Sequence, residues 1–375
     1  MRREPGVSGI PLAAQVGRVA SMRVPLDAAQ EQRFQRLLDE LVLLDMHEHP
    51  MVLPDDPARF GEYFRGNAYT WGYQAVKHGG WTAVATANIF SCMGKEPEAS
   101  YARFGDLVDE IGLMLADVSC RADVRLVRRA DDVIAAKQAG QIGWLPTLEH
   151  LAIGDQLHRV DVLYGMGVRL AGLTYTRRSP IGDGQYERTD CGLSELGVEV
   201  VRRMNERGMA IDLSHAGPRT AQEAIALSAA PVIFSHNAAY ALRPTRRSRA
   251  DADFVACAEK GGLVCVTAVP NSLSDDPQQD INCVLDHYDY LVRLVGVDHV
   301  GIGTDTLIGD HVGFHRVMLG RDAPDELPAP YLNGLESPAD GTNLIRGLIA
   351  RGYDDASIRK IAGQNALDFF RRTFG

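Results

Sequence analysis

Eight short apolar runs follow one another along the chain from residue 41 onward, and they constrain the fold more than any other feature of the sequence. Each run has the length and the β-branched content of a buried strand, and turn or polar residues separate one run from the next. The runs cover residues 41–46, 82–89, 142–148, 168–175, 209–213, 232–235, 263–268 and 300–304. We expect each of them to form a strand.

Segments with the apolar spacing of amphipathic helices lie between most of these runs. Examples are residues 193–207, 220–228, 252–260 and 284–294. Strands that alternate with helices form βα units, and the strands of a parallel sheet have nearly continuous apolar sequences. Eight such units match a closed (β/α)8 TIM barrel.

A doubly wound open sheet is the alternative arrangement of βα units. Such a sheet normally carries a glycine-rich phosphate-binding turn after an early strand, whereas His-Glu-His-Pro follows the first run here. No G-x-x-x-x-G-K-[ST] or G-x-G-x-x-G motif opens a helix in the required place. We therefore expect an α/β fold of the TIM-barrel type. Residues 1–40 would form an N-terminal extension with a first helix, and residues 41–375 a single catalytic barrel.

Composition and charge exclude several classes of function. A chain of 375 residues can bury a large core without disulfides, and a net charge of −10 disfavours binding to nucleic acid. No apolar run reaches the ~18 residues of a membrane span. Pro11, Gln15, Gly17 and Arg18 interrupt the early segment that would have to serve as a signal peptide. The six cysteines form no C-x-x-C pair, as is usual for reduced thiols, so we expect a cytoplasmic protein.

Possible metal ligands come directly after five of the predicted strands. They are His47 and His49 after the first strand, Glu149 after the third, His215 after the fifth, His236 after the sixth and Asp305 after the eighth. The carboxyl ends of barrel strands meet at one mouth, so these side chains should converge. A single histidine after a strand is more often a loop or capping residue. The agreement of six residues with five strand ends predicts a metal site. Imidazole and carboxylate ligands suit zinc, and one carboxylate can bridge two ions.

Long connections follow four of the predicted strands and would also lie at the barrel mouth. They cover residues 49–80, 176–192, 269–282 and 306–340. Barrel enzymes build active sites and lids from such segments. His311 and His315 belong to the last of them, and either could reach a substrate.

Arginines are concentrated just beyond the sixth strand, in the segment LRPTRRSR. They are Arg243, Arg246, Arg247 and Arg249. In an acidic protein this group indicates recognition of an anionic substrate, because a guanidinium group binds a carboxylate in a bidentate fork. A solvated helix start is the alternative for any single arginine. Arg177 and Arg178, after the fourth strand, leave the same two possibilities open.

At these residues the sequence resembles the membrane (renal) dipeptidase family of zinc metallopeptidases, in the amidohydrolase superfamily. The resemblance is most specific over residues 210–247, where AIDLSH, PVIFSHNAAY and RPTRR stand in the order and spacing of the family. It extends more loosely from LLDMHEHP to QNALDFF near the C-terminus. The resemblance implies a (β/α)8 barrel with two zinc ions per chain that hydrolyses dipeptides.

The resemblance also implies roles for individual ligands. His47 and position 49, which is His49 here, would bind one zinc ion, and His215 and His236 would bind the second. Glu149 and a hydroxide would bridge the two ions.

For the substrate, the resemblance implies that Arg247 holds the C-terminal carboxylate, and Arg246 stands beside it as a further substrate-binding residue. Asp305 is implied as part of the metal cluster and as the acid/base. It would take a proton from the bridging water, which attacks the carbonyl, and pass that proton to the leaving amine.

Three positions depart from the family pattern. The family has H-x-D at the first strand, whereas this chain has His49. The loss of one negative charge should lower the pKa of bound water and weaken metal retention. The family has a histidine after the fourth strand where Tyr175 stands here, and a phenol can also donate a hydrogen bond to an oxyanion. The family's G-D-F-D-G appears as Thr304-Asp305-Thr306-Leu307, which keeps only the first acid.

The leading prediction is therefore a binuclear zinc hydrolase. It would cleave the amide bond of a dipeptide, or of a dipeptide-like molecule, that bears a free carboxylate. Tyr175 and His49 keep a second possibility open, in which the same site acts on a lactone, a cyclic amide or another small carboxylated metabolite as a hydrolase, lyase or decarboxylase. A non-catalytic binding protein is the third possibility. The expected partner is a small molecule, not nucleic acid or a membrane, and the resemblance is compatible with a homodimer.

Overall fold

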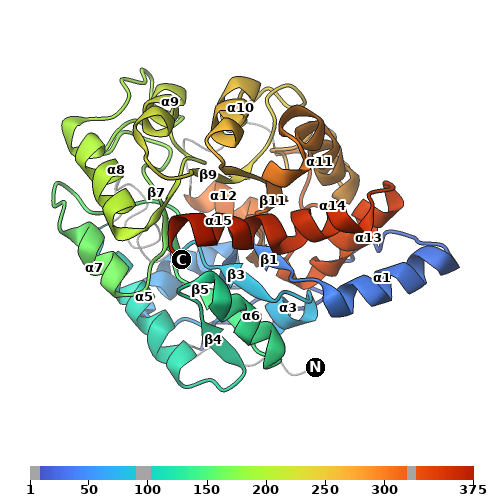
Figure 1. The fold of residues 1–375 in the computed structure, drawn as a ribbon. Helices are drawn as coiled ribbons and strands as arrows, with labels where there is room; N and C mark the ends of the chain where they lie inside the picture. Colours follow the sequence, from blue (N-terminus) through green and yellow to red (C-terminus); the bar gives the residue numbers. More distant parts are fainter. Residues whose placement is uncertain (1–8, 90–102, 319–326) are drawn as a thin grey trace.

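The computed structural model describes residues 9–89, 103–318 and 327–375, and parallel strands form its centre (Figure 1). The strands are β1 (Leu44–Asp45), β2 (His49–Val52), β3 (Ala83–Ala85), β4 (Val124–Leu126), β5 (Ile142–Leu145), β6 (Thr147–Leu148), β7 (Leu170–Gly172), β8 (Ala210–Asp212), β9 (Ile233–Asn237), β10 (Leu263–Val266), β11 (Val300–Ile302) and β12 (Leu307–Ile308).

Helices surround these strands, and most of them cover the outside, as Figure 1 shows. They are α1 (Ala28–Glu40), α2 (Phe60–Gly66), α3 (Tyr73–His78), α5 (Phe104–Ser119), α6 (Ala130–Gln138), α7 (Arg159–Gly165), α8 (Glu195–Arg207), α9 (Pro218–Leu227), α10 (Asp251–Glu259), α11 (Ile281–Val295), α12 (His311–Met318), α13 (Thr342–Ala350), α14 (Asp355–Arg359) and α15 (Asn365–Thr373). Short 3-10 turns lie at Pro57–Arg59, Val297–His299 and Pro338–Asp340, and a π-helical turn, Lys360–Gln364, joins α14 to α15.

The strands close into a barrel through two connections. Strands β1, β3, β5 and β4 form one sheet, and β6 to β11 form another in sequence order. Pro146, which has no N–H to donate, separates β5 from β6, so the run over residues 142–148 belongs to both sheets. At the other seam the Met46 N–H donates to the Ile302 carbonyl at 2.9 Å. All eight predicted strands are present, and the prediction of a TIM barrel is confirmed.

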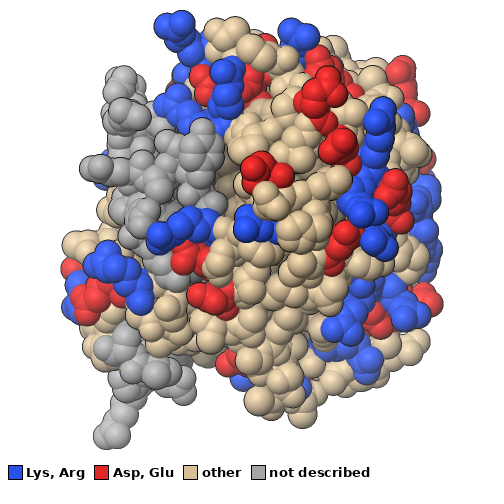
Figure 2. All heavy atoms as spheres, turned by 90° about the vertical axis from the view of Figure 1, so that its left-hand side faces the viewer, with Lys and Arg blue, Asp and Glu red and all other residues tan. Residues whose placement is uncertain are grey.

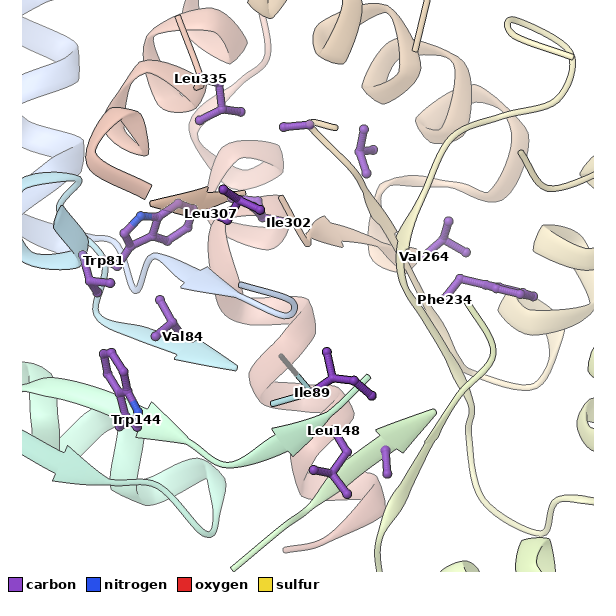
Figure 3. Packing of buried hydrophobic residues seen from close by; sticks show 14 of the residues in the cluster. Trp81, Val84, Ile89, Trp144, Leu148, Phe234, Val264, Ile302, Leu307 and Leu335 are labelled. Carbon is purple, nitrogen blue, oxygen red and sulfur yellow. The ribbon is translucent and has the colours of Figure 1, made fainter. Parts of the chain in front are cut away.

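Apolar side chains divide between the inside of the barrel and the layer under the helices. One cluster lines the interior and includes Ala83, Leu145 and Cys265, together with Phe369 and Phe370 of α15. The larger cluster lies between strands and helices. Figure 3 shows part of it, with Val84, Trp144, Phe234 and Val264 on the strands. Neighbours along a strand thus point to opposite faces, so both faces of the sheet are buried, as in other parallel sheets.

The N-terminal segment is anchored to the barrel at several points. The Asp27 side chain caps α1 in a capping box with Gln30, which fixes where that helix begins. Upstream, Asn343 of α13 binds the Met22 and Val24 backbone through its side chain. The Ala13 N–H donates to the Leu53 carbonyl at 2.9 Å. These contacts tie residues far apart in sequence into the same packed unit.

Two of the four connections predicted to be loops contain regular structure. Residues 49–80 hold β2, α2 and α3, and residues 306–340 hold β12 and α12, so the expectation of loops was wrong there. β12 pairs in parallel with β2, which adds a small two-stranded sheet outside the barrel. Strand β4 was also missed, because Val-Arg-Leu is too short to show a pattern.

Charges of both signs are interspersed on the molecular face that Figure 2 shows, with no large region of one sign. None of the helices in the described parts of the chain combines the length and the apolar character that a bilayer crossing requires. Cys120, Cys191, Cys257, Cys265 and Cys283 are free thiols, and Cys92 lies outside the described residues.

Candidate active site

The six predicted ligands converge at the carboxyl ends of the barrel strands. His47 follows β1, His49 begins β2, and Glu149 follows β6. The remaining three are His215, beyond β8, His236, within β9, and Asp305, beyond β11. All six side chains are nearly or fully buried.

Glu149 lies between two groups of histidines. Its Oε1 is 2.9 Å from His215 Nε2, and its Oε2 is 3.9 Å from His49 Nε2. His47, His49 and Glu149 bring their ligand atoms close enough to hold one ion, and so do Glu149, His215 and His236. The same carboxylate therefore belongs to both groups.

Asp305 lies against the same histidines. Its Oδ1 is 3.1 Å from His49 Nε2 and 3.7 Å from His47 Nε2, and it forms a third possible ligand group with His47 and His236. The backbone of Asp305 has φ 56°, and its N–H donates to the His47 carbonyl at 2.8 Å. A non-glycine residue in this left-handed region is uncommon, and such residues cluster at functional sites.

Ser235 fixes the orientation of two imidazole rings. Its hydroxyl donates to the Asp212 carboxylate in a very short hydrogen bond. Because the only proton of the hydroxyl is used there, its lone pairs accept from His47 Nδ1 at 3.2 Å and from His236 Nδ1 at 2.7 Å. Both rings then carry their proton on Nδ1, which leaves a lone pair on Nε2 that faces the cluster.

Burial controls the protonation of the cluster. It lowers the pKa of His47 to about 3 and holds the pKa values of His215 and His236 well below the ordinary value. Burial also raises the pKa of Glu149 to about 8. These imidazoles are neutral at pH 7, and neutral imidazole is the form that binds metal.

Asp305 and His49 shift each other in opposite directions. Burial would raise the pKa of Asp305, but the hydrogen bond from His49 and the neighbouring imidazole of His47 outweigh it and lower the pKa. Burial would lower the pKa of His49, and the same hydrogen bond and the charge of Glu149 raise it. Asp305 is therefore ionised at neutral pH and able to accept a proton.

The cluster has the properties of a site for cations. His47 Nε2 is buried without a hydrogen-bond partner. His215 Nε2 and His236 Nε2 are 2.9 Å apart, and both belong with Glu149 to a group of ligand atoms that could hold one ion. The mixture of imidazole and carboxylate donors suits zinc.

Tyr175 and Arg247 flank His215. The rings of Tyr175 and His215 have centroids 4.4 Å apart, and burial raises the pKa of Tyr175 well above its ordinary value, so its phenol keeps its proton. Arg247 donates to the Ser214 carbonyl at 2.7 Å and to the His236 carbonyl at 3.0 Å. The structure thus brings both residues to the edge of the ligand cluster.

A cavity of about 400 Å³ opens over the cluster, a volume within the usual range for small-molecule sites. His49, Glu149, His215, His236 and Asp305 form its floor, and it is also lined by Tyr175, Arg246 and Arg247. His311 and His315 of α12 line it too, with ring centroids 4.7 Å apart.

Sequence reasoning missed the acids beneath the ligands. Asp45 accepts from the His47 N–H at 3.0 Å, and the Thr304 hydroxyl lies within hydrogen-bond distance of both Asp45 and Glu48, at 2.5 and 3.0 Å. Burial raises the pKa of Asp45 to about 7 and that of Glu48 well above its ordinary value. Asp212, under Ser235, is a third such acid. An acidic residue inside an apolar strand was the available signal, because a buried carboxyl group requires hydrogen-bond partners.

Solved structures with the same fold include two bacterial hydrolases. An amidohydrolase from Pseudomonas aeruginosa is 26% identical, with a TM-score of 0.76, and the match covers 91% of this chain and 99% of that one. A metallo peptidase from Rhodobacter sphaeroides, solved with a phosphinate mimic of the dipeptide L-Ala-D-Ala, is 21% identical with a TM-score of 0.70, and the match covers 89% and 99%.

Sequence comparisons agree with the structural ones. Dipeptidase tcpJ of Claviceps purpurea (strain 20.1) is 27% identical over 276 residues, which are 72% of this chain and 60% of that relative. The family model described as "Membrane dipeptidase (Peptidase family M19)" matches residues 31–312. The resemblance inferred from the sequence is confirmed, and the chain belongs to the membrane dipeptidase family.

Proposed function

We propose that this protein is a binuclear zinc hydrolase that cleaves the amide bond of a dipeptide, or of a dipeptide-like molecule, with a free carboxylate. The observation that carries the proposal is the position of Glu149. This one carboxylate belongs to two groups of ligands, in the floor of a cavity that Arg247 also lines.

The residues that would hold the metal follow from the same two groups. His47, His49 and Glu149 would hold one ion, and Glu149, His215 and His236 would hold the other. When bound, two zinc ions would supply Lewis acidity for the scissile carbonyl and would lower the pKa of a bound water molecule.

Arg247 would bind the C-terminal carboxylate of the substrate. Its two Nη atoms are held by backbone carbonyls of Ser214 and His236 instead of by an acidic side chain, so its charge is not neutralised by those contacts. A carboxylate bound there places the adjacent amide bond over the ligand cluster, because Arg247 Nη2 is 3.3 Å from His215 Nε2.

Asp305 would move the proton. Its ionised carboxylate accepts a proton from the attacking water and then donates that proton to the leaving amine, which is thus released in neutral form. The neutral phenol of Tyr175 can donate a hydrogen bond to the oxygen of the scissile carbonyl as negative charge develops there. Tyr175 would thus donate the hydrogen bond that a histidine at the same position provides in the family pattern.

Hydrolysis of a dipeptide panel tests the proposal. Protein loaded with zinc should contain two ions per chain by elemental analysis and should release both amino acids from L-L or L-D dipeptides. The matching dipeptide amides, which lack the carboxylate for Arg247, should react about tenfold or more slowly. If protein that carries two zinc ions cleaves none of the dipeptides in the panel, the proposal is ruled out.

A further inference from the structure

The imidazole of His215 has one nitrogen in the ligand cluster and one nitrogen outside it. Its Nε2 is 2.9 Å from Glu149 Oε1 and 2.9 Å from His236 Nε2, so this nitrogen belongs to the ligand group. Its Nδ1, on the opposite side of the ring, lies 3.5 Å from the side-chain amide of Gln185. Gln185 is therefore placed directly behind a predicted metal ligand.

The backbone fixes Gln185 in this place. Its N–H donates to the His215 carbonyl at 3.0 Å, and an antiparallel bridge joins the preceding residue, Gly184, to Ala216. A Cβ atom on Gly184 would lie 2.0 Å from the Tyr175 carbonyl oxygen, so the loop can fold back this closely only with glycine there. The loop after β7 is thus paired with the segment after β8 that carries His215.

The side chain of Gln185 has an unpaired polar atom. It is buried, and its Oε1 has no hydrogen-bond partner within the described residues. The last torsion of a glutamine side chain is roughly two-fold, so a half-turn exchanges Oε1 with Nε2. Gln185 can therefore present either an acceptor or a donor to His215 Nδ1. An unpaired buried amide oxygen is uncommon, and a metal-bound His215 would supply its partner.

Metal binding sets the tautomer that His215 must adopt. A neutral imidazole that binds a cation through Nε2 carries its proton on Nδ1, and a partner that accepts this proton fixes the ring. Ser235 provides such an acceptor for His47 and for His236. For His215 Nδ1, the hydrogen-bond contact within the described residues is the one with Gln185.

We propose that Gln185 is the positioning residue of His215, and that its amide oxygen accepts the Nδ1–H of this ring when Nε2 binds metal. This inference rests on the metal-binding part of the proposed function and adds a residue to it. Gln185 acts on one ion, because His215 belongs to one of the two ligand groups that share Glu149 and is absent from the other. Loss of the Gln185 amide should therefore weaken the binding of one zinc ion and spare the other.

Zinc affinities of matched variants provide the test. Gln185→Met removes both polar atoms and keeps the length of the side chain. Competition with a chromophoric chelator should then show one ion bound about 10- to 100-fold more weakly and the other unchanged. Gln185→Glu keeps an acceptor at the same reach and should keep both ions tightly bound. Gln278→Met, at an exposed position before α11, is the control and should keep both affinities within about threefold, as surface substitutions usually do.

A spectroscopic measurement separates positioning from general damage to the fold. In zinc-loaded protein labelled with 15N-histidine, the ring of His215 should carry its proton on Nδ1, and the Gln185 amide should protect that proton from exchange with water. Gln185→Met should lose the protection, and Gln185→Glu should keep it. An Nδ1–H signal that exchanges equally fast in wild type and in Gln185→Met overturns the inference.

Neither measurement requires turnover, so this inference and the dipeptidase proposal can fail separately. Equal zinc affinities in wild type and Gln185→Met overturn the inference, and so does an equal weakening of both ions, which would indicate a general loss of structure. Both results leave the dipeptidase proposal intact. If no dipeptide is cleaved and Gln185→Met binds one ion weakly, the dipeptidase proposal fails and this inference is supported.

Discussion

At the scale of single residues, Asp305 combines a strained backbone with a position at the centre of the site. The left-handed φ of 56° costs roughly 1–2 kcal/mol for a residue with a Cβ atom. The hydrogen bond from its N–H to the His47 carbonyl holds that conformation. The strained backbone is consistent with a requirement that the Asp305 carboxylate point toward the histidines of the site.

Asp305→Asn tests that carboxylate. An amide cannot accept and return the proton, so kcat for a cleaved dipeptide should fall about 10²- to 10⁴-fold. Zinc should remain bound, because the two ligand groups that share Glu149 are intact. Asp275→Asn, at a side chain that is 84% exposed, is the control and should keep kcat within about twofold, as surface substitutions usually do. An unchanged kcat in Asp305→Asn would remove it from the proposed mechanism.

Ser235 offers a prediction on metal affinity. Ser235→Ala removes the shared acceptor of His47 Nδ1 and His236 Nδ1, so both rings lose their fixed tautomer. Affinity for zinc should fall about 10- to 100-fold, the range observed when partners behind metal ligands are removed. Competition with a chromophoric chelator measures it. Ser228→Ala, at a buried serine next to α9, should leave the affinity unchanged.

At the scale of elements, two glycines let neighbouring strands approach closely at the barrel mouth. A Cβ atom on Gly172 of β7 would lie 2.0 Å from the Glu149 carbonyl oxygen. A Cβ atom on Gly303, after β11, would lie 1.6 Å from the Ser235 carbonyl oxygen. Both contacts are with the backbone beside a residue of the site, so strand packing and site geometry are coupled there.

Gly172→Ala should therefore damage the site through the fold. The methyl group pushes away the backbone of Glu149, which should cost about 1–3 kcal/mol in the free energy of unfolding and lower the zinc content below two ions. Urea denaturation and elemental analysis measure the two effects. Gly165→Ala, at the end of α7, meets nothing within 4 Å and should change neither. Full zinc content in a destabilised Gly172→Ala protein would show that Glu149 is held independently of β7.

The sequence predicted the strands because they form continuous apolar runs, and it predicted the outer helices because their apolar residues recur with a helical period. Residues 284–294, for example, lie within α11, and residues 252–260 nearly coincide with α10. Helix α12 was missed, since its glycine and its flanking segments read as a loop, although His311 and His315 are four residues apart on one helical face. The division of residues 142–148 between two sheets depends on which strands lie beside it, which no local pattern records.

At the scale of the whole molecule, the buried acids and histidines of the site affect the stability of the metal-free protein, because burial disfavours their charged forms. Asp45, Glu48 and Glu149 have pKa values raised by burial, to about 7 for Asp45 and about 8 for Glu149. His47 has a pKa lowered to about 3 by burial. Folding without metal therefore requires the acids to take up protons that they release in the unfolded chain.

The pH dependence of stability follows with a definite sign. Between about pH 4.5 and 6.5 the acids favour folding less as pH rises and the buried histidines favour it more, so the two trends oppose each other. Above the unfolded pKa of histidine, about 6.5, the acids with raised pKa values continue to lose protons, and His49, whose pKa is also raised, changes stability in the same direction. The free energy of unfolding of the metal-free protein should therefore decrease from pH 6.5 to 8. The decrease is about 1.4 kcal/mol per pH unit for each proton that the folded chain binds in excess of the unfolded chain.

Differential scanning calorimetry at pH 6.5 and 8 measures this effect. The melting temperature of metal-free protein should be lower at pH 8, whereas zinc-loaded protein should show a smaller decrease or none, because the cations stabilise ionised Glu149. Equal decreases in both forms would show that the titrating acids lie outside the influence of the metal.

The convergence of the ligands was predictable, and their surroundings were not. The rule that barrel strands end at one mouth was enough to group His47 with Asp305. The hydrogen bond from Ser235 to Asp212 depends on the pairing of β9 with β8, which the periodicity of a single segment does not describe. The roles assigned to the ligands, to Tyr175 and to Arg247 stay predictions until the experiments above are done.

The seam between β1 and β11 has a consequence for how the protein is made. His47 follows the first strand of the barrel, and Asp305, whose N–H donates to the His47 carbonyl, follows the last. A ribosome that has synthesised only the first seven strands has produced a chain with most of its ligands but no closing strand. Stable metal capture would then come late, after release of the last barrel strand, and a chain truncated before residue 300 should purify without zinc.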